Sequence, residues 1–206
     1  MHVGTNHDGP VIIGFGHRRR TGKDAVAGLV RDRLRAAGAN VFRDAFAWNL
    51  KQVTRMMFRY VGLADDTVYE DCPDLREKKM PGIEMSPRDL WIAVGNKIRE
   101  IAPDVWIRGV LDNPAYVSGS VLLISDVRYP NEVKAIRDRG GAVIKVVRPG
   151  IPESADIADS ALAGMKTGAW DRVVLNDGDL DALDRKAGFL AEWIGRRLAA
   201  RNAAMG

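Results

Sequence analysis

The chain has 206 residues, of which 46% are hydrophobic and 28% are charged. This balance is typical of a soluble globular protein and excludes a disordered chain, and the length suffices for one domain with a buried core. The net charge of +4 suits anionic ligands such as nucleotides or nucleic acid, but it equally fits an uneven surface charge without consequence.

No apolar run reaches the roughly 20 residues of a membrane span. The first ten residues lack the apolar core of a signal peptide, so we expect a cytoplasmic protein without a membrane partner. Cys72 is the single cysteine, which excludes a disulfide framework and a cysteine-based metal site and indicates a reducing compartment.

Strands and helices alternate along the N-terminal part. The patterns predict a buried strand at 10–16, a helix at 22–37, a strand at 40–47 and a helix at 48–61. In the second of these helices we expect Met56, Met57 and Phe58 to pack in the core. Residues 62–85 are polar and irregular, and we interpret them as a mobile segment rather than a linker between domains.

The same alternation continues to the C-terminus. The patterns predict helices at 86–101 and 103–112, a strand at 121–127, a helix at 131–139, a strand at 142–148, a strand at 172–177 and a final helix at 180–201. Ser86 is the expected N-cap of its helix, with Pro87 at the first helical position. Such an order predicts a parallel sheet in a three-layer α/β fold, in which ligands bind at the carboxyl ends of the strands.

The stretch HRRRTGKD, residues 17–24, ends like a phosphate-binding loop. Lys23 would reach the β and γ phosphates, and Arg18, Arg19 and Arg20 add cations beside them. His17 stands where the standard pattern has glycine, which is tolerable if its backbone conformation is ordinary. Asp24 replaces the usual hydroxyl residue, and its carboxylate can hold magnesium or a magnesium-bound water. The alternative is a basic turn that happens to contain Gly-Lys, but the flanking strand and helix favour phosphate binding.

A second carboxylate follows the apolar run VLLIS. Asp126 and Lys23 are both expected at the carboxyl ends of strands, so Asp126 is a candidate for the magnesium side of a phosphate site. Taken alone, an Asp at the end of a hydrophobic strand is common. Arg128 is expected to point toward the same cleft, and its alternative role is a surface ion pair with Glu132.

Four stretches together resemble a known family. They are RTGKD, SPRDLWIAVGNKIREIAPDVWIR, LISDVRYPNEVKAIRDRGGAVIKVVRPG and DRVVLNDGDLDAL. The chain thereby resembles the phage deoxynucleoside monophosphate kinases, a branch of the P-loop nucleoside monophosphate kinases, over nearly its full length. The resemblance implies one P-loop kinase domain over 1–206 with a five-stranded parallel sheet, an acceptor-binding lobe at about 45–101 and a lid at about 149–171.

The resemblance also implies site residues. Those for ATP are His17, Arg18, Arg19, Arg20, Thr21, Gly22, Lys23, Asp24 and Ala25, with Asn176 and Asp177 near the adenine. Those for the deoxynucleoside monophosphate are Arg76, Arg88, Gly95, Trp106, Asp126 and Arg128. Lys23, Asp126 and Arg128 would be catalytic, and Asp24 and Asp126 would hold Mg²⁺. Trp106 is a candidate for stacking on the base, although a buried core tryptophan is commoner.

One feature of the family is missing. After VVRPG its members often carry a His followed by Ser or Thr and Glu, whereas Asp156 and Asp159 stand near those positions here. A role that depends on that His is therefore not implied for this chain.

The implied reaction is in-line transfer of the ATP γ-phosphoryl group to a deoxynucleoside monophosphate. A phosphomevalonate kinase-like activity is the nearest alternative, because a Gly-Lys-Asp loop also occurs there. A non-catalytic nucleic-acid-binding module is a further alternative, but aromatic residues are only 7% and are not interleaved with the basic ones, so no nucleic acid is expected. Kinases of this type can be dimers, so a homodimer is left open.

Overall fold

The computed structural model describes residues 9–151 and 161–204. The chain divides into two compact units, which are described separately. The first comprises Met1–Ala45 and Asn113–Gly206, and the second comprises Phe46–Asp112. Asp156 and Asp159 lie outside the described residues, as does the central part of the expected lid.

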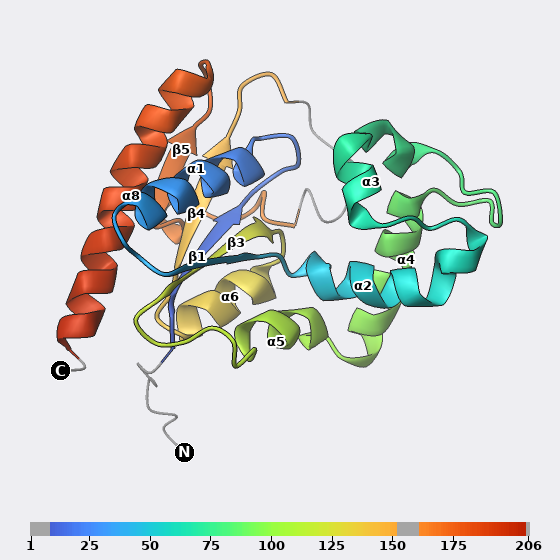
Figure 1. Ribbon diagram of the computed structural model, residues 1–206, viewed down its shortest axis with the longest axis horizontal. Coiled ribbons are helices and arrows are strands. Elements are labelled where there is room, and N and C mark those ends of the chain that lie inside the picture. Colours follow the sequence, from blue (N-terminus) through green and yellow to red (C-terminus); the bar gives the residue numbers. More distant parts are fainter. Residues whose placement is uncertain (1–8, 152–160, 205–206) are drawn as a thin grey trace. The chain divides into compact units, whose positions relative to one another are not determined.

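The first unit contains the sheet (Figure 1). Its elements are β1 (Val11–Gly16), α1 (Lys23–Ala36), β2 (Val41–Asp44), β3 (Val121–Val127), α6 (Pro130–Asp138), β4 (Ala142–Val147), η3 (Thr167–Ala169), β5 (Arg172–Leu175) and α8 (Leu180–Ala203). The five strands are all parallel in the order β2-β3-β1-β4-β5, so β1 lies in the centre. Every residue of β1 is buried, as expected for a strand covered on both faces.

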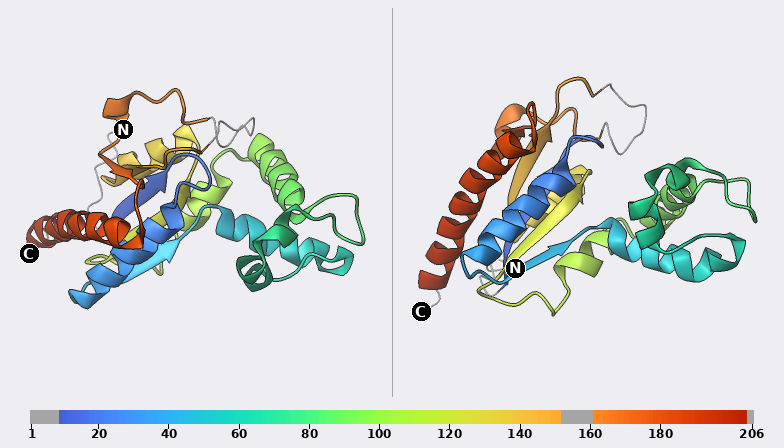
Figure 2. Two further views of the ribbon diagram at one scale, coloured as in Figure 1. Left: turned by 90° about the horizontal axis from the view of Figure 1, so that it is seen from above. Right: turned by 45° about the horizontal axis from the view of Figure 1, so that its top comes forward.

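Helices cover both faces of this sheet, as Figures 1 and 2 show. Helices α1 and α8 pack together on one face, where Val26 and Val30 of α1 and Ile194 of α8 join the main apolar core. Helix α6 covers the other face and buries Val133 and Ile136. The predicted three-layer α/β fold with a five-stranded parallel sheet is confirmed.

The pairing of β1 with β3 is irregular near the carboxyl ends of the strands. Gly14 pairs with Ile124 but Gly16 pairs with Val127, so β3 contains one extra residue over this interval. A bulge of this kind bends the strand and re-aims the side chains beside it. Asp126 lies within the bulged interval, and it therefore belongs to the irregular end of β3 rather than to the regular ladder.

The second unit is helical. Its elements are α2 (Ala47–Phe58), η1 (Arg59–Val61), α3 (Asp66–Asp71), η2 (Pro73–Glu77), α4 (Pro87–Ile101) and α5 (Val105–Leu111). Ser86 caps α4 as predicted, because its Oγ accepts a hydrogen bond from the backbone N–H of Asp89 at 3.2 Å. Among the described residues of both units, no helix is long and apolar enough to cross a membrane.

Two expectations about the second unit are wrong. Residues 62–85 are not irregular, because they contain α3 and η2, and a small core of Leu63, Tyr69 and Met80 packs with Leu90 of α4. These apolar residues are too far apart in the sequence to form a periodic pattern. Met56 and Met57 do not pack in the core, since they are 74% and 55% exposed, whereas Phe58 packs partly against this cluster.

Strand β2 is also shorter than the predicted 40–47. It ends at Asp44, whose Oδ1 accepts a hydrogen bond from the backbone N–H of Ala45 at 2.7 Å. That local bond takes the N–H out of the ladder, so the strand ends here. Strand β5 likewise ends at Leu175, two residues before the predicted limit.

Candidate active site

The loop between β1 and α1 depends on Gly22. This residue caps α1 with φ +92°, a left-handed conformation that favours glycine. A Cβ at this position would also lie 2.5 Å from Nδ2 of Asn176. Asn176 donates from Nδ2 to the carbonyl of Thr21 at 3.0 Å, so the segment after β5 supports the loop from one side.

Lys23 is folded back into this loop. It is only 5% exposed, and its Nζ donates to the carbonyl oxygens of His17 at 3.0 Å and Arg18 at 2.5 Å. Thr21 Oγ1 donates to the same Arg18 carbonyl at 2.9 Å. The ammonium group is therefore held where the loop and the N-terminus of α1 meet, which is the place at which a phosphate would be bound.

The backbone conformation of His17 is not the ordinary one that the sequence analysis required. Its backbone has φ +104°, so a residue with a side chain adopts the conformation that the standard glycine would adopt. Burial, reinforced by the cations Lys145, Arg18 and Lys23, lowers the pKa of His17 to about 4. The imidazole is therefore neutral at neutral pH, although it lies in a strongly basic loop.

The residues around His17 come from β4 and from the segment before β5. Trp170 lies against Gly16, where a Cβ would approach its ring to 2.9 Å, and Lys145 Nζ lies 5.9 Å from the Trp170 ring centroid. Nδ1 of His17 and Nε1 of Trp170 are both buried without a hydrogen-bond partner among the described residues. Sequence reasoning missed Lys145 and Trp170, because neither belongs to the loop motif.

Three arginines follow His17 in the loop. Arg18 and Arg19 are partly buried, whereas Arg20 is exposed. Arg20 also has positive φ, at +62°, so two residues with side chains and Gly22 share left-handed conformations within six positions. Ala25 follows in the first turn of α1 and is exposed.

The two predicted magnesium ligands have different surroundings. Asp24 is 76% exposed and forms an ion pair with Arg43 of β2, whose Nη2 lies 2.6 Å from its Oδ1. Asp126 is partly buried at the bulge of β3. Among the described residues, no group of three or more His, Cys, Asp or Glu side chains is arranged to hold a metal ion. Sequence reasoning also missed Arg43, which only the strand arrangement brings to Asp24.

Arg128 follows β3 directly and is partly buried. The buried carboxylate of Glu132 accepts hydrogen bonds from the backbone N–H groups of Arg128 at 2.7 Å and Tyr129 at 3.0 Å. Glu132 thus fixes the backbone that carries Arg128 and starts α6. Asp177, the last predicted residue of this unit, pairs with Lys186 of α8 at 2.5 Å, which lowers the pKa of Asp177.

In the second unit, two of the predicted acceptor residues contact each other, and the other two lie in or beside η2 and α4. Trp106 is buried and its indole N–H donates to the carbonyl of Gly95 at 3.4 Å, so these two lie together in the packing of α4 and α5. Arg88, at the start of α4, lies 3.8 Å from Glu77, which follows Arg76 in η2. Arg76 Nε is buried without a hydrogen-bond partner among the described residues.

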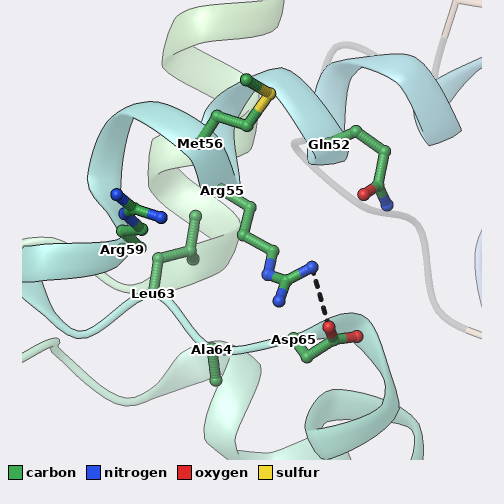
Figure 3. A pocket seen from close by; sticks show the side chains of 7 residues that line it. All are labelled: Gln52, Arg55, Met56, Arg59, Leu63, Ala64 and Asp65. Carbon is green, nitrogen blue, oxygen red and sulfur yellow. Dashed lines mark ion pairs between the residues drawn. The ribbon is translucent and has the colours of Figure 1, made fainter.

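A cavity of about 430 Å³ opens in the second unit (Figure 3). It lies beside α2, and Arg55 spans it to form an ion pair with Asp65 at 2.8 Å. It is lined by Gln52, Arg55, Met56, Arg59, Leu63, Ala64 and Asp65. None of the predicted site residues lines it.

Comparison with protein families finds one family whose model matches this chain. The model of the deoxynucleotide monophosphate kinase family matches residues 84–187, slightly more than half of the chain. The chain belongs to the deoxynucleotide monophosphate kinase family. The matched range contains Arg88, Gly95, Trp106, Asp126 and Arg128, together with the bulged end of β3.

A viral protein is similar in sequence to most of this chain. A protein of Acanthamoeba polyphaga mimivirus, provisionally named a deoxynucleotide monophosphate kinase, is 27% identical over 193 residues, which cover 83% of this chain and 91% of the viral protein. Among solved structures, the APS kinase of Mycobacterium tuberculosis in complex with AMPPNP and APS is 15% identical, with a TM-score of 0.38 and coverage of 89% of this chain and 98% of that one. The fold is defined by the order of its five parallel strands.

Proposed function

We propose that this family member transfers the γ-phosphoryl group of ATP to a deoxynucleoside monophosphate, giving ADP and a deoxynucleoside diphosphate. The observation that carries the proposal is the position of Lys23, which is buried at the N-terminus of α1 and hydrogen-bonded to two loop carbonyls. An ammonium group held in this way is a ready partner for the β and γ phosphates.

On the donor side, the loop supplies charge and backbone donors. Lys23 exchanges loop carbonyls for phosphate oxygens, and the first N–H groups of α1 bind the same phosphates along the helix dipole. Arg18, Arg19 and Arg20 neutralise further negative charge. His17 stays neutral, so it contributes a compact polar ring rather than a further cation.

The side chains present fit a magnesium ion that arrives with ATP. Asp24 and Asp126 offer carboxylate oxygens, which magnesium prefers, and one or two carboxylates together with substrate phosphates are its usual ligands. The absence of a cluster of three or more acidic or ligating side chains among the described residues suits this shared mode better than an all-protein cage. When bound, the ion neutralises charge on the transferred group.

On the acceptor side, we assign Arg76 and Arg88 of the second unit to the phosphate of the deoxynucleoside monophosphate. The buried, unpartnered Nε of Arg76 supports this assignment, because a buried guanidinium nitrogen without a partner is costly unless a ligand satisfies it. Gly95 and Trp106 are assigned to the base side. Since Trp106 is buried and bonded to Gly95, we assign it a packing role that shapes this region.

The chemical step needs no general base, since the acceptor phosphate is already ionised at neutral pH. The protein contributes position and charge, through Lys23 and Arg128 on the transferred phosphoryl group and Asp126 at the metal. These groups bind the in-line transition state more strongly than the bound substrates, and this difference accelerates the reaction.

The test is ADP release from MgATP with a panel of acceptors, comprising dTMP, dGMP, dCMP, dAMP, 5-hydroxymethyl-dCMP, the ribonucleotides and phosphomevalonate. We expect turnover with one or more deoxynucleotides and its loss in Lys23→Met. Arg31→Ala is the matched control, because Arg31 lies on α1 and pairs with the neighbouring Asp32 outside the loop. Turnover with phosphomevalonate alone would reassign the substrate. A folded protein that binds DNA in a salt-dependent way, without turnover, would contradict the kinase assignment.

A further inference from the structure

The ion pair between Asp24 and Arg43 connects the phosphate loop to a distant strand. Asp24 follows Lys23 directly in the first turn of α1, and Arg43 is the penultimate residue of β2. In the sheet β3 separates β2 from β1, so the pair reaches across one strand position to the start of α1. Nη2 of Arg43 donates to Oδ1 of Asp24 at 2.6 Å.

This pair has little importance for folding. The Asp24 side chain is 76% exposed and that of Arg43 is 32% exposed, and pairs of this kind contribute little to stability. Because the pair lies beside the loop that precedes α1, it affects the charge that an incoming phosphate group would meet. A carboxylate beside a phosphate loop repels an incoming polyphosphate, and the guanidinium group neutralises that carboxylate before any metal is present.

A metal ion changes the relation between the two side chains. Magnesium binding to Asp24 uses the same carboxylate that Arg43 engages, so the ion and the guanidinium group compete for it. Arg43 therefore has opposite effects in the two conditions. It favours the binding of metal-free ATP, and it opposes the contribution of Asp24 to the binding of MgATP.

We propose that Arg43 is a positioning residue for Asp24 and sets the metal dependence of ATP binding at the loop. The proposal rests on ATP binding there, as described under Proposed function. It assigns no contact between Arg43 and the nucleotide. The prediction is consequently specific, because removing Arg43 changes the metal dependence of ATP affinity only while Asp24 keeps its charge.

The experiment measures ATP affinity by isothermal titration calorimetry, with EDTA and with excess Mg²⁺. The proteins are the wild type, Arg43→Ala, Asp24→Asn and the double variant. Arg43→Ala is expected to weaken metal-free ATP binding by about three- to tenfold and to leave MgATP binding unchanged or stronger. In the Asp24→Asn background the same change is expected to have no effect on the ratio of the two affinities.

Two further variants complete the design. Arg43→Lys keeps the positive charge and is expected to restore most of the wild-type ratio. Arg31→Ala removes an arginine of α1 that pairs with Asp32, and it is expected to leave both affinities unchanged. Thermal unfolding of every variant checks that the loss of an exposed pair has not unfolded the protein.

The outcomes separate the two proposals. If Arg43→Ala lowers both affinities by the same factor in both backgrounds, Arg43 contacts the nucleotide itself and the inference is overturned while the loop remains an ATP site. If ATP binds and Lys23→Met abolishes binding, but Arg43→Ala has the same effect on the two affinities with and without Asp24→Asn, the inference alone fails. If the folded wild type binds no ATP in either condition, the proposed function and the inference fail together.

Discussion

Asn176 and Thr21 are 155 positions apart in the sequence and share a hydrogen bond of 3.0 Å from Nδ2 to the backbone carbonyl. The backbone N–H of Asn176 in turn donates to Val147 at 2.7 Å, so the end of β4 holds Asn176 while Asn176 holds the loop. Asn176 is 8% exposed. It therefore has a structural role beside the loop between β1 and α1, and its predicted contact with adenine stays a prediction.

Asn176→Ala should weaken both the fold and the loop. A buried carbonyl loses its donor, which costs about 1–2 kcal/mol of unfolding free energy, and the less organised loop should bind ATP about tenfold more weakly. Urea unfolding and calorimetry measure the two effects. Asn176→Asp is the matched variant, since it keeps the shape but cannot donate. Wild-type ATP affinity in Asn176→Asp would show that this bond does not organise the loop.

Two glycines near the start of α1 should respond to alanine in opposite directions. Gly22→Ala places a Cβ at φ +92° and 2.5 Å from Asn176 Nδ2, so we expect a loss of at least about 1–2 kcal/mol and poor ATP binding. Gly28 lies inside α1 with no atom within 4 Å of an added Cβ. Gly28→Ala should stabilise the protein by up to about 1 kcal/mol. Equal melting temperatures for the two variants would contradict the loop geometry.

His17 should make the protein sensitive to acid. The folded-state pKa is about 4 and the unfolded value is 6.5, so the unfolded chain binds more protons between these limits. The contribution of the neutral imidazole to stability is complete above pH 6.5 and is lost as the pH falls through 4. After allowance for solvent screening, it is on the order of 2 kcal/mol.

His17→Gly tests this contribution and the strained backbone together. Glycine adopts φ +104° without strain, which should add about 1 kcal/mol at all pH values. It also removes the titrating group, so the advantage of the variant over the wild type should be larger at pH 4.5 than at pH 8. Urea unfolding at the two pH values measures the difference. An advantage that is the same at both would show that His17 is not held neutral by the fold.

The hydroxyl of Tyr116 donates to Oδ2 of Asp44 at the end of β2. Burial, together with this carboxylate, raises the pKa of Tyr116 well above its ordinary value. The bond stabilises the protein at neutral pH and is lost as the pH rises through the raised pKa. Tyr116→Phe should cost about 1 kcal/mol at pH 8. In an absorbance titration at 295 nm, the difference between the wild type and the variant should show a phenolate that forms above the ordinary pKa of tyrosine, and half-formation at about pH 10 would contradict the bond.

The strands and helices of the first unit could be predicted because their patterns are local. The apolar run before Asp126 and the helical spacing of Val26 and Val30 reflect which face of each element is buried. This pattern is visible within a short window of sequence. The region 62–85 could not be predicted in this way. Its core joins Leu63, Tyr69 and Met80, whose spacing follows no helical or strand period.

The same distinction between local and long-range contacts applies to the candidate site. By itself the sequence determined the fold class, the family resemblance and the loop residues up to Lys23 and Asp24, because these depend on neighbours in the chain. Only the tertiary structure decided the partners that hold the loop residues, which are Arg43 for Asp24 and Asn176 for Thr21. It likewise decided that Tyr116 holds Asp44 at the end of β2. The physical reason is that such pairs depend on which strands are adjacent and in what register, and burial of the whole sheet sets that arrangement.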